Sequence, residues 1–219
     1  SFGRGFLSQL WAGTTARDAI VATSRAGQAV VERLFAALRQ GYGLDPDRFV
    51  APTLARIPLG VDPRAFTCLE GAARQAARRE LGLDPEAVVL LVFGRIAHSS
   101  KMDLLPLLRA MRRVLAAGID PRSLCLVVAG WTEADPLARP DPILATLAEL
   151  AANIGLPFRA VARPSEPVKQ TLFGLADIFV SLADNPQETF GLTLLEAMAA
   201  GLPVVASDYD GYKDLAEHG

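Results

Sequence analysis

Two glutamates near the end of the sequence, Glu188 and Glu196, have the residue type and spacing that point most directly to chemistry. Glu196 is the only charged residue between Phe190 and Ser207, in a segment whose pattern predicts an apolar helix. A carboxylate in such a helix is costly to desolvate unless it finds hydrogen-bond partners. Glu188 lies just before the same helix, where backbone N–H groups are free and the helix dipole is positive. Two acids at one helix start, with Gly191 between them, predict a pocket for a ligand that carries hydroxyls and phosphates.

The elements that position these glutamates are alternating strands and helices. Short apolar runs, which are typical of strands buried on both faces, alternate with helical patterns from about residue 87 onward. This alternation indicates βαβ units and therefore an α/β fold with a doubly wound parallel sheet. We expect strands at 87–93, 124–129, 158–162, 177–181 and 203–207, and helices at 71–80, 104–117, 143–153, 168–175 and 191–200.

The first part of the chain has a different pattern. Residues 20–23 predict one strand, and residues 25–40 predict a helix that follows it. Residues 57–63 are dense in turn formers, which is typical of a connector. A lone strand and helix cannot fold by themselves, so we expect residues 1–57 to be the last piece of a preceding domain. Residues 58–219 would then form the parallel-sheet domain, and we expect the sequence to be a fragment cut at both ends.

Composition excludes several functional classes. The chain has 219 residues and a formal net charge of −2, which argues against bulk electrostatic binding to nucleic acid. No apolar run is long enough to span a membrane. Cys68 and Cys125 match no metal-ligand or redox spacing, so we expect a reducing, intracellular setting. Dinucleotide fingerprints, P-loops, nucleophile elbows and zincin motifs do not occur.

Charged side chains gather where the predicted strands end, at the edge where open parallel sheets bind ligands. Gly94 and Arg95 follow the first strand, Lys101 comes shortly after, and Arg163 follows the third strand. Arginine and lysine both neutralise phosphate, and the N–H groups of the helix at Gly191 serve the same purpose. Carboxylates instead accept hydrogen bonds from sugar hydroxyls. A diphosphate with a sugar at each end satisfies all of these groups together.

Each of these residues also has a purely structural alternative. Arg95 and Lys101 are then ordinary surface charges, and Glu188 is an acid favoured only by the helix dipole. Glu196 is then a buried acid that hydrogen bonds to the backbone. Trp131, which follows the second strand, is then a packing residue and not a platform for a base. The combination of groups at one edge, and no single residue, favours the ligand site.

Several segments resemble one known family. Residues 188–205 read ETFGLTLLEAMAAGLPVV, which resembles the glutamate–seven residues–glutamate motif of retaining glycosyltransferases of family 4, also described as group 1 glycosyltransferases. Residues 57–62 resemble the interdomain segment of these enzymes, and residues 93–95 resemble their Gly-Arg strand end. Residues 176–181 and 206–208 fit as well. The resemblance covers most of the chain and is weakest at its beginning.

These enzymes have two domains and the GT-B fold. The resemblance implies that residues 58–219 are the C-terminal, Rossmann-like domain that binds the nucleotide sugar, truncated at its C-terminus. Residues 1–57 are by the same resemblance a remnant of the N-terminal acceptor domain with the connector. The implied reaction transfers a sugar from a UDP-, GDP- or ADP-linked donor to an acceptor hydroxyl with retention of configuration. No metal or other cofactor is implied, because cations and the helix terminus act on the departing diphosphate.

The resemblance also assigns roles to individual residues. Arg95 and Lys101 resemble the pair that holds the donor diphosphate and stabilises the leaving group. Glu188 resembles the glutamate that contacts the donor sugar, and Glu196 resembles the one that binds the ribose hydroxyls. The implied catalytic residues are therefore Arg95, Lys101 and Glu188, and the implied donor-binding residues are Gly94, Arg95, Lys101, Arg163, Glu188, Thr189, Phe190, Gly191, Leu192, Thr193 and Glu196.

The chain departs from the family pattern at three positions. Lys101 lies one residue further from Arg95 than is usual, and Met102 replaces the glycine that normally follows the lysine. Ala162 stands where a glycine is often found. The family's catalytic histidine and its acceptor loop belong to the N-terminal domain, so we expect the 219-residue chain alone not to turn over.

The expected setting is the cytoplasm of a bacterium. The acceptor, a glycan or a lipid, and any peripheral membrane contact would be met through the missing domain, and no nucleic-acid partner is expected. Two alternatives remain for the function: a non-catalytic module that binds a nucleotide sugar, and a GT-B nucleotide-sugar epimerase.

Overall fold

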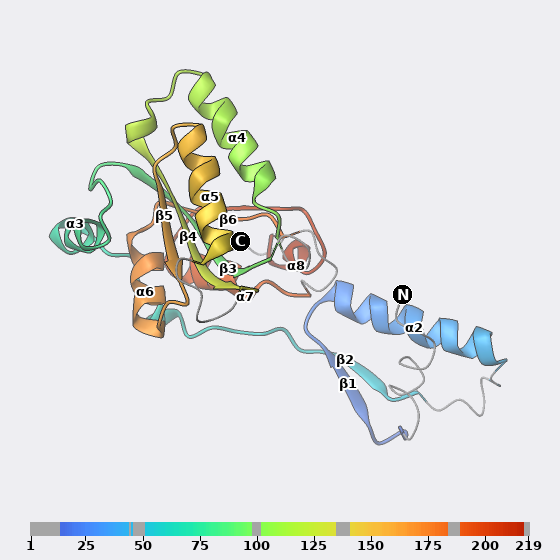
Figure 1. Ribbon diagram of the computed structural model, residues 1–219. Helices are drawn as coiled ribbons and strands as arrows, with labels where there is room; N and C mark the ends of the chain where they lie inside the picture. The colour runs from blue at the N-terminus through green and yellow to red at the C-terminus, as the bar shows by residue number, and fades with distance from the viewer. Residues whose placement is uncertain are drawn as a thin grey trace.

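The computed structural model describes residues 14–43, 45, 51–97, 102–134, 141–183 and 189–216. Its centre is a sheet of five parallel strands in the order β5-β4-β3-β6-β7 (Figure 1). The strands are β3 (Val88–Ile96), β4 (Leu124–Thr132), β5 (Phe158–Ala162), β6 (Ile178–Ser181) and β7 (Val204–Ala206). All five predicted strands are present, which confirms the predicted α/β fold with a parallel sheet.

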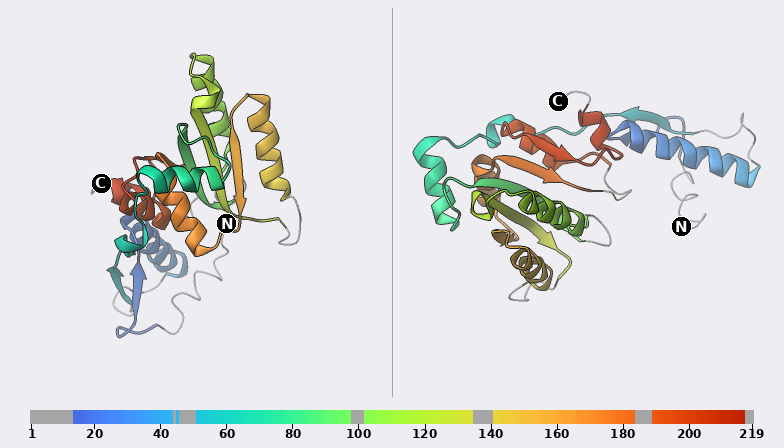
Figure 2. Two further views of the ribbon diagram at one scale, coloured as in Figure 1. Left: turned by 90° about the vertical axis from the view of Figure 1, so that its left-hand side faces the viewer. Right: turned by 90° about the horizontal axis from the view of Figure 1, so that it is seen from above.

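Helices connect these strands and cover both faces of the sheet (Figure 2). Each long helix was expected within two residues of its observed ends. The helices are α3 (Gly71–Glu80), α4 (Leu105–Ala116), α5 (Pro142–Asn153), α6 (Glu166–Leu175), α7 (Leu192–Ala199) and the short α8 (Tyr212–Ala216), with 3-10 turns η1 (Pro63–Ala65) and η2 (Pro121–Ser123). The sequence pattern did not predict α8.

Alternating side chains of the central strand β3 divide the interior into two cores. Val89, Leu91 and Phe93 belong to a core shared with α6, α7 and α8. Val92 and Ile96 belong to a second core shared with α4 and α5. Because side chains alternate along a strand, a strand covered on both faces is apolar without interruption. This explains the continuous apolar run in the sequence.

Strands β3 and β4 run three residues further than predicted, because their glycines do not end them. Gly94 pairs with Gly130 within the ladder, and the strands continue to Ile96 and Thr132. Gly130 has φ 140°, and a Cβ at this position would lie 1.8 Å from the carbonyl oxygen of Gly94. The glycines therefore permit a close approach of the two backbones and place the residues after them on the edge of the sheet.

The sheet order contains a switch point between β3 and β6. Chain connections run from β3 toward β4 and β5 on one side, whereas β6 and β7 lie on the other side. Ligands of doubly wound sheets bind outside the carboxyl ends of the strands at such a point. The carboxyl ends of β3 and β6 flank it, and most of the predicted site residues follow these two strands in the sequence.

The N-terminal unit contains β1 (Ala19–Ala22), α2 (Arg25–Tyr42) and β2 (Thr53–Arg56). The strands β1 and β2 form a separate parallel pair, and the unit lies beside the main sheet (blue to cyan in Figure 1). The expectation of a lone strand was wrong, because the four residues of β2 lie among turn formers and carry no clear alternation. Helix α2 also runs past Gly41 and ends at Gly43, which adopts the left-handed conformation.

Candidate functional site

The structure brings the described residues of the predicted site to the carboxyl edge of the main sheet. Gly94 and Arg95 lie near the end of strand β3, and Arg163 directly follows β5. Residues 190–193 form the start of α7, and Glu196 lies one turn further along it. Lys101 and Glu188 lie outside the described residues, so their predicted roles stay predictions.

The start of α7 has backbone N–H groups without a side-chain cap. The N-cap residue is Gly191, which has φ 90°. Glycine has no side chain that could accept a hydrogen bond from the first N–H groups of the helix. A Cβ on Gly191 would lie 2.4 Å from the ring of Tyr212 in α8, and the Tyr212 hydroxyl is 2.7 Å from Oγ of Ser181 in β6. Uncapped N–H groups at a helix N-terminus form a ready anion site. The glycine and the tyrosine together fix this helix start against the end of β6.

Glu196 is buried, and its two carboxylate oxygens have different environments. Its side chain is 5% exposed, and Oε1 lies 2.6 Å from Nζ of Lys169 in α6. Oε2 is buried and has no donor within the part of the chain that the structure describes. Burial raises the pKa of Glu196, against the opposing hydrogen bond and charge of Lys169. The partner that the structure shows for this acid is therefore the side chain of Lys169, and not the backbone as the structural alternative expected.

Sequence reasoning did not identify Lys169. Its side chain is 13% exposed and lies 3.6 Å from a carboxylate oxygen of Glu166. Its ammonium also lies 5.2 Å from the ring centroid of Phe66 and 5.6 Å from that of Phe93. Such distances allow cation–π attraction. One signal in the sequence could have drawn attention to it: lysine is rare in this chain, with three lysines among 22 basic residues.

Trp131 and Arg95 are neighbours across the β3–β4 ladder. The indole ring packs edge-on against Phe93 with ring centroids 5.8 Å apart, yet Trp131 is 43% exposed. Arg95 is exposed beside it. The indole therefore packs against Phe93 on one side and is accessible to solvent on the other.

Arg163 is held by the end of strand β4 and by a residue that follows it. Its backbone N–H donates to the carbonyl of Gly130 at 2.7 Å, and its guanidinium donates to the carbonyl of Ala134 at 3.1 Å. Its φ of 49° lies in the left-handed region, which a residue with a side chain adopts only when the surroundings enforce it. Part of the donor capacity of Arg163 is therefore used to shape the edge of the site.

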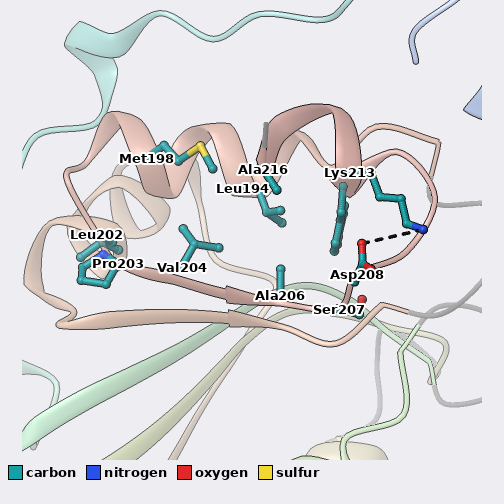
Figure 3. A pocket seen from close by; sticks show the side chains of 11 residues that line it. Leu194, Met198, Leu202, Pro203, Val204, Ala206, Ser207, Asp208, Lys213 and Ala216 are labelled. Atoms are coloured by element: carbon teal, nitrogen blue, oxygen red, sulfur yellow. Dashed lines mark ion pairs between the residues drawn. The ribbon is translucent and has the colours of Figure 1, made fainter. Parts of the chain in front are cut away.

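A pocket formed by described residues lies elsewhere. It has a volume of about 590 Å³ and is lined by residues of α7, β7 and α8 (Figure 3). Leu194 lines it and precedes Glu196 by two residues, which is about 200° around a helix. The cavity and Glu196 are thus on different faces of α7. Its lining is largely apolar, with one ion pair of 3.8 Å between Lys213 and Asp208, so it does not suit a diphosphate.

Among the residues that the structure describes, no group of three or more His, Cys, Asp or Glu side chains is arranged to hold a metal ion. Within the same residues, no helix is both long and apolar enough to cross a membrane.

Comparison with solved structures supports the fold. The Anabaena protein HepE in complex with UDP and glucose superposes with a TM-score of 0.68 at 19% identity, over 100% of this chain and 52% of HepE. Sucrose-phosphate synthase from Thermosynechococcus elongatus superposes with a TM-score of 0.63 at 20% identity, over 97% of this chain and 46% of the synthase. These matches confirm the predicted Rossmann-like fold of a GT-B C-terminal domain.

Curated relatives are more similar in sequence. D-inositol 3-phosphate glycosyltransferase of Rhodococcus opacus is 35% identical over 177 residues, which is 78% of this chain and 35% of that enzyme. The enzyme of the same name from Geodermatophilus obscurus is 37% identical over 183 residues, which is 81% of this chain and 37% of the relative. This chain thus spans about a third of the length of these relatives.

A family model, glycosyl transferases group 1, matches residues 73–219. The match includes the strands β3 to β7, the uncapped start of α7 and Glu196. This chain therefore belongs to the group 1 glycosyl transferases.

Proposed function

We propose that this chain is the donor-binding part of a retaining glycosyltransferase of family 4. The whole enzyme would transfer a sugar from a nucleotide sugar to an acceptor hydroxyl with retention of configuration. One observation carries the proposal: Glu196 presents a buried oxygen without a described donor, beside the uncapped start of α7, at the switch point of the sheet. A carboxylate oxygen and a row of N–H groups together suit a ribose linked to a diphosphate.

Each group at the edge has a distinct task in this proposal. The N–H groups at residues 190–193 and the cations of Arg95 and Lys101 bind the diphosphate and stabilise the negative charge that develops as the sugar departs. Glu196 accepts hydrogen bonds from the ribose hydroxyls. Glu188 contacts the donor sugar. Because these groups already neutralise the leaving diphosphate, we propose that the reaction needs no metal ion or other cofactor.

The division of the chain belongs to the same proposal. Residues 1–57 would be a remnant of the acceptor domain with its connector, and residues 58–219 would be the donor domain. The acceptor is then selected outside this chain. D-inositol 3-phosphate, which the names of the curated relatives contain, is the first acceptor to test with the longer protein, beside a glycan or lipid acceptor. A cytoplasmic location, with peripheral membrane contact through the other domain, fits this arrangement.

Nuclear magnetic resonance can test where a nucleoside diphosphate binds. We expect UDP, GDP or ADP to shift the backbone signals of residues 190–193 and the carboxyl signal of Glu196. Signals of Val204 and Lys213, which line the apolar cavity, serve as the internal control and should stay unchanged. Shifts confined to the cavity, with none at the start of α7, would contradict the proposed function.

A further inference from the structure

The two oxygens of the Glu196 carboxylate are used differently, and Lys169 causes the difference. Oε1 receives the ammonium of Lys169 at 2.6 Å. Oε2 is equally shielded from solvent yet has no described donor. A buried acceptor left without a donor is unfavourable, so an arrangement built for stability alone would supply one. Lys169 thus holds the carboxylate through Oε1, and Oε2 remains available to accept a hydrogen bond from a ligand.

Lys169 is fixed from three sides. Glu166 lies one turn earlier on α6, Phe66 follows the turn η1, and Phe93 belongs to strand β3. Together with Glu196 on α7, these groups leave the ammonium few alternative positions. A long lysine side chain normally loses considerable conformational freedom when it is held in place. Here the aromatic rings and the two carboxylates compensate for that loss.

Stability alone does not explain this pair. Replacing a buried ion pair by apolar side chains of similar volume is often neutral or stabilising. Phe66 and Phe93, whose rings lie against Lys169, both belong to an apolar core. The retained charge pair therefore points to a task that an apolar pair cannot perform.

We propose that Lys169 is a positioning residue that holds Glu196 by Oε1, so that Oε2 accepts a hydrogen bond from a ribose hydroxyl and the site prefers ribose over deoxyribose. The inference rests on the proposed donor-site function and adds a residue that sets its selectivity. A site built to accept from a hydroxyl rejects an analogue without it, because the buried acceptor is then left unpaired.

The experiment compares Lys169→Met with Lys213→Met, a matched control that removes a lysine from a more exposed ion pair on α8. Affinities for the best-bound of UDP, GDP and ADP, and for its 2′-deoxy and 3′-deoxy forms, are measured by calorimetry. We expect the parent chain to prefer the ribose form by about tenfold to a hundredfold over at least one deoxy form, as a hydrogen bond to a charged acceptor predicts. Lys169→Met should reduce this ratio to about twofold, whereas Lys169→Arg should restore most of it and Lys213→Met should leave it unchanged.

A second measurement does not depend on a nucleotide. The carboxyl carbon of Glu196 is followed by nuclear magnetic resonance as the pH changes. Lys169→Met removes the group that opposes the effect of burial, so the titration of Glu196 should move to higher pH, while Lys213→Met should leave it in place. An unchanged titration in Lys169→Met would overturn the inference even before any ligand is added.

The possible results distinguish a failure of the proposed donor-site function from a failure of the proposed role of Lys169. If the parent chain binds none of the nucleotides, the proposed function fails and the selectivity proposal falls with it. If the parent chain binds and Lys169→Met keeps the same ribose preference, only the role of Lys169 is wrong. Should Lys169→Met fail to fold, the double variant Lys169→Met/Glu196→Met removes both charges of the pair. We expect the double variant to bind the nucleotide without a preference for ribose. A retained preference would overturn the inference.

Discussion

At the scale of single residues, the family-like segments contain both ligand candidates and structural anchors. Asp177, within the segment 176–181 that fits the family, does not face the proposed site. It accepts hydrogen bonds from Arg74, from Arg78 at 2.6 Å and from the backbone N–H of Val89 at 2.7 Å. Arg78 is almost completely buried and also donates to three backbone carbonyls. This cluster joins α3, β3 and the start of β6.

Removing the Asp177 carboxylate should therefore lower stability. Asp177→Ala leaves the buried guanidinium of Arg78 without its counter-ion, which we expect to cost about 3 kcal/mol. Urea unfolding followed by circular dichroism measures the change. Asp120→Ala, which removes an exposed pair with Arg122 and the cap of the short turn η2, is the control and should lower the midpoint much less. Equal midpoints for the two variants would show that the cluster does not stabilise the fold.

Removing the charge of Glu196 should weaken nucleotide binding without lowering the stability of the fold at pH 7. Burial raises the pKa of Glu196, so the folded chain holds this proton more tightly than the unfolded chain. The associated stability is fully present below the unfolded pKa, about 4.3, and is lost as pH rises through the folded pKa. Glu196→Gln removes that loss, so the variant should be at least as stable as the parent at pH 7 while it binds nucleoside diphosphate more weakly. Unfolding free energies from pH 4 to pH 8 test this; a variant that becomes relatively less stable with rising pH contradicts it.

At the scale of elements, the sequence predicted what depends on local pattern. Five apolar runs and the helical patterns between them were enough to predict the parallel sheet and the carboxyl edge at which the candidate site lies. Two features that depend on pairing between distant segments were missed. Strands β3 and β4 continue through their glycines because Gly94 and Gly130 face each other, and Lys169 becomes significant only because α6 packs beside α7.

The start of α7 depends on glycine at position 191. Gly191→Ala combines an unfavourable φ of 90° with a Cβ that would lie 2.4 Å from the ring of Tyr212. Gly201→Ala has a similar backbone conformation, φ 74°, with nothing within 4 Å, so it is the matched control. We expect Gly201→Ala to cost about 1 kcal/mol and to leave nucleotide binding intact. Gly191→Ala should lower the free energy of unfolding by more than this and should also weaken nucleotide binding, because the N–H groups at the start of α7 shift. Calorimetry that finds the same nucleotide affinity for both variants would contradict this prediction.

The N-terminal unit contacts the main sheet domain through Asp214 of α8. This carboxylate accepts from the backbone N–H of Arg25 at 2.8 Å and from its guanidinium at 2.9 Å, and Arg56 lies 3.8 Å away. Burial acts to raise the pKa of Asp214, but the hydrogen bonds from Arg25 and the charges of both arginines outweigh it, so the pKa is lowered.

Asp214→Asn should therefore loosen α2 and β2. A lowered carboxyl pKa contributes stability that is present above the unfolded pKa and is lost as pH falls through the folded pKa. The variant should lose about 1 kcal/mol at pH 7 and little at pH 3, since partly exposed ion pairs contribute modestly. Hydrogen exchange of the amides of α2 measures the effect. Exchange that is unchanged at pH 7 would show that this contact does not join the two units.

At the scale of the whole molecule, the described chain contains one side of a proposed active site. The sheet, its switch point and the start of α7 suit a nucleotide sugar, and the chain spans about a third of the length of its curated relatives. A transferase must also position an acceptor hydroxyl beside the donor sugar. We therefore expect this chain to bind a donor nucleotide without transferring its sugar.

The measurement that tests this account most directly is a calorimetric titration of the chain with UDP, GDP and ADP. We predict that at least one of them binds and that Glu196→Gln weakens its binding about tenfold or more, because a charged acceptor is replaced by a neutral amide. Glu149→Gln, on the exposed side of α5, should bind like the parent chain. If none of the three nucleotides binds, or if the two glutamine variants bind equally well, the donor site is not where this account places it.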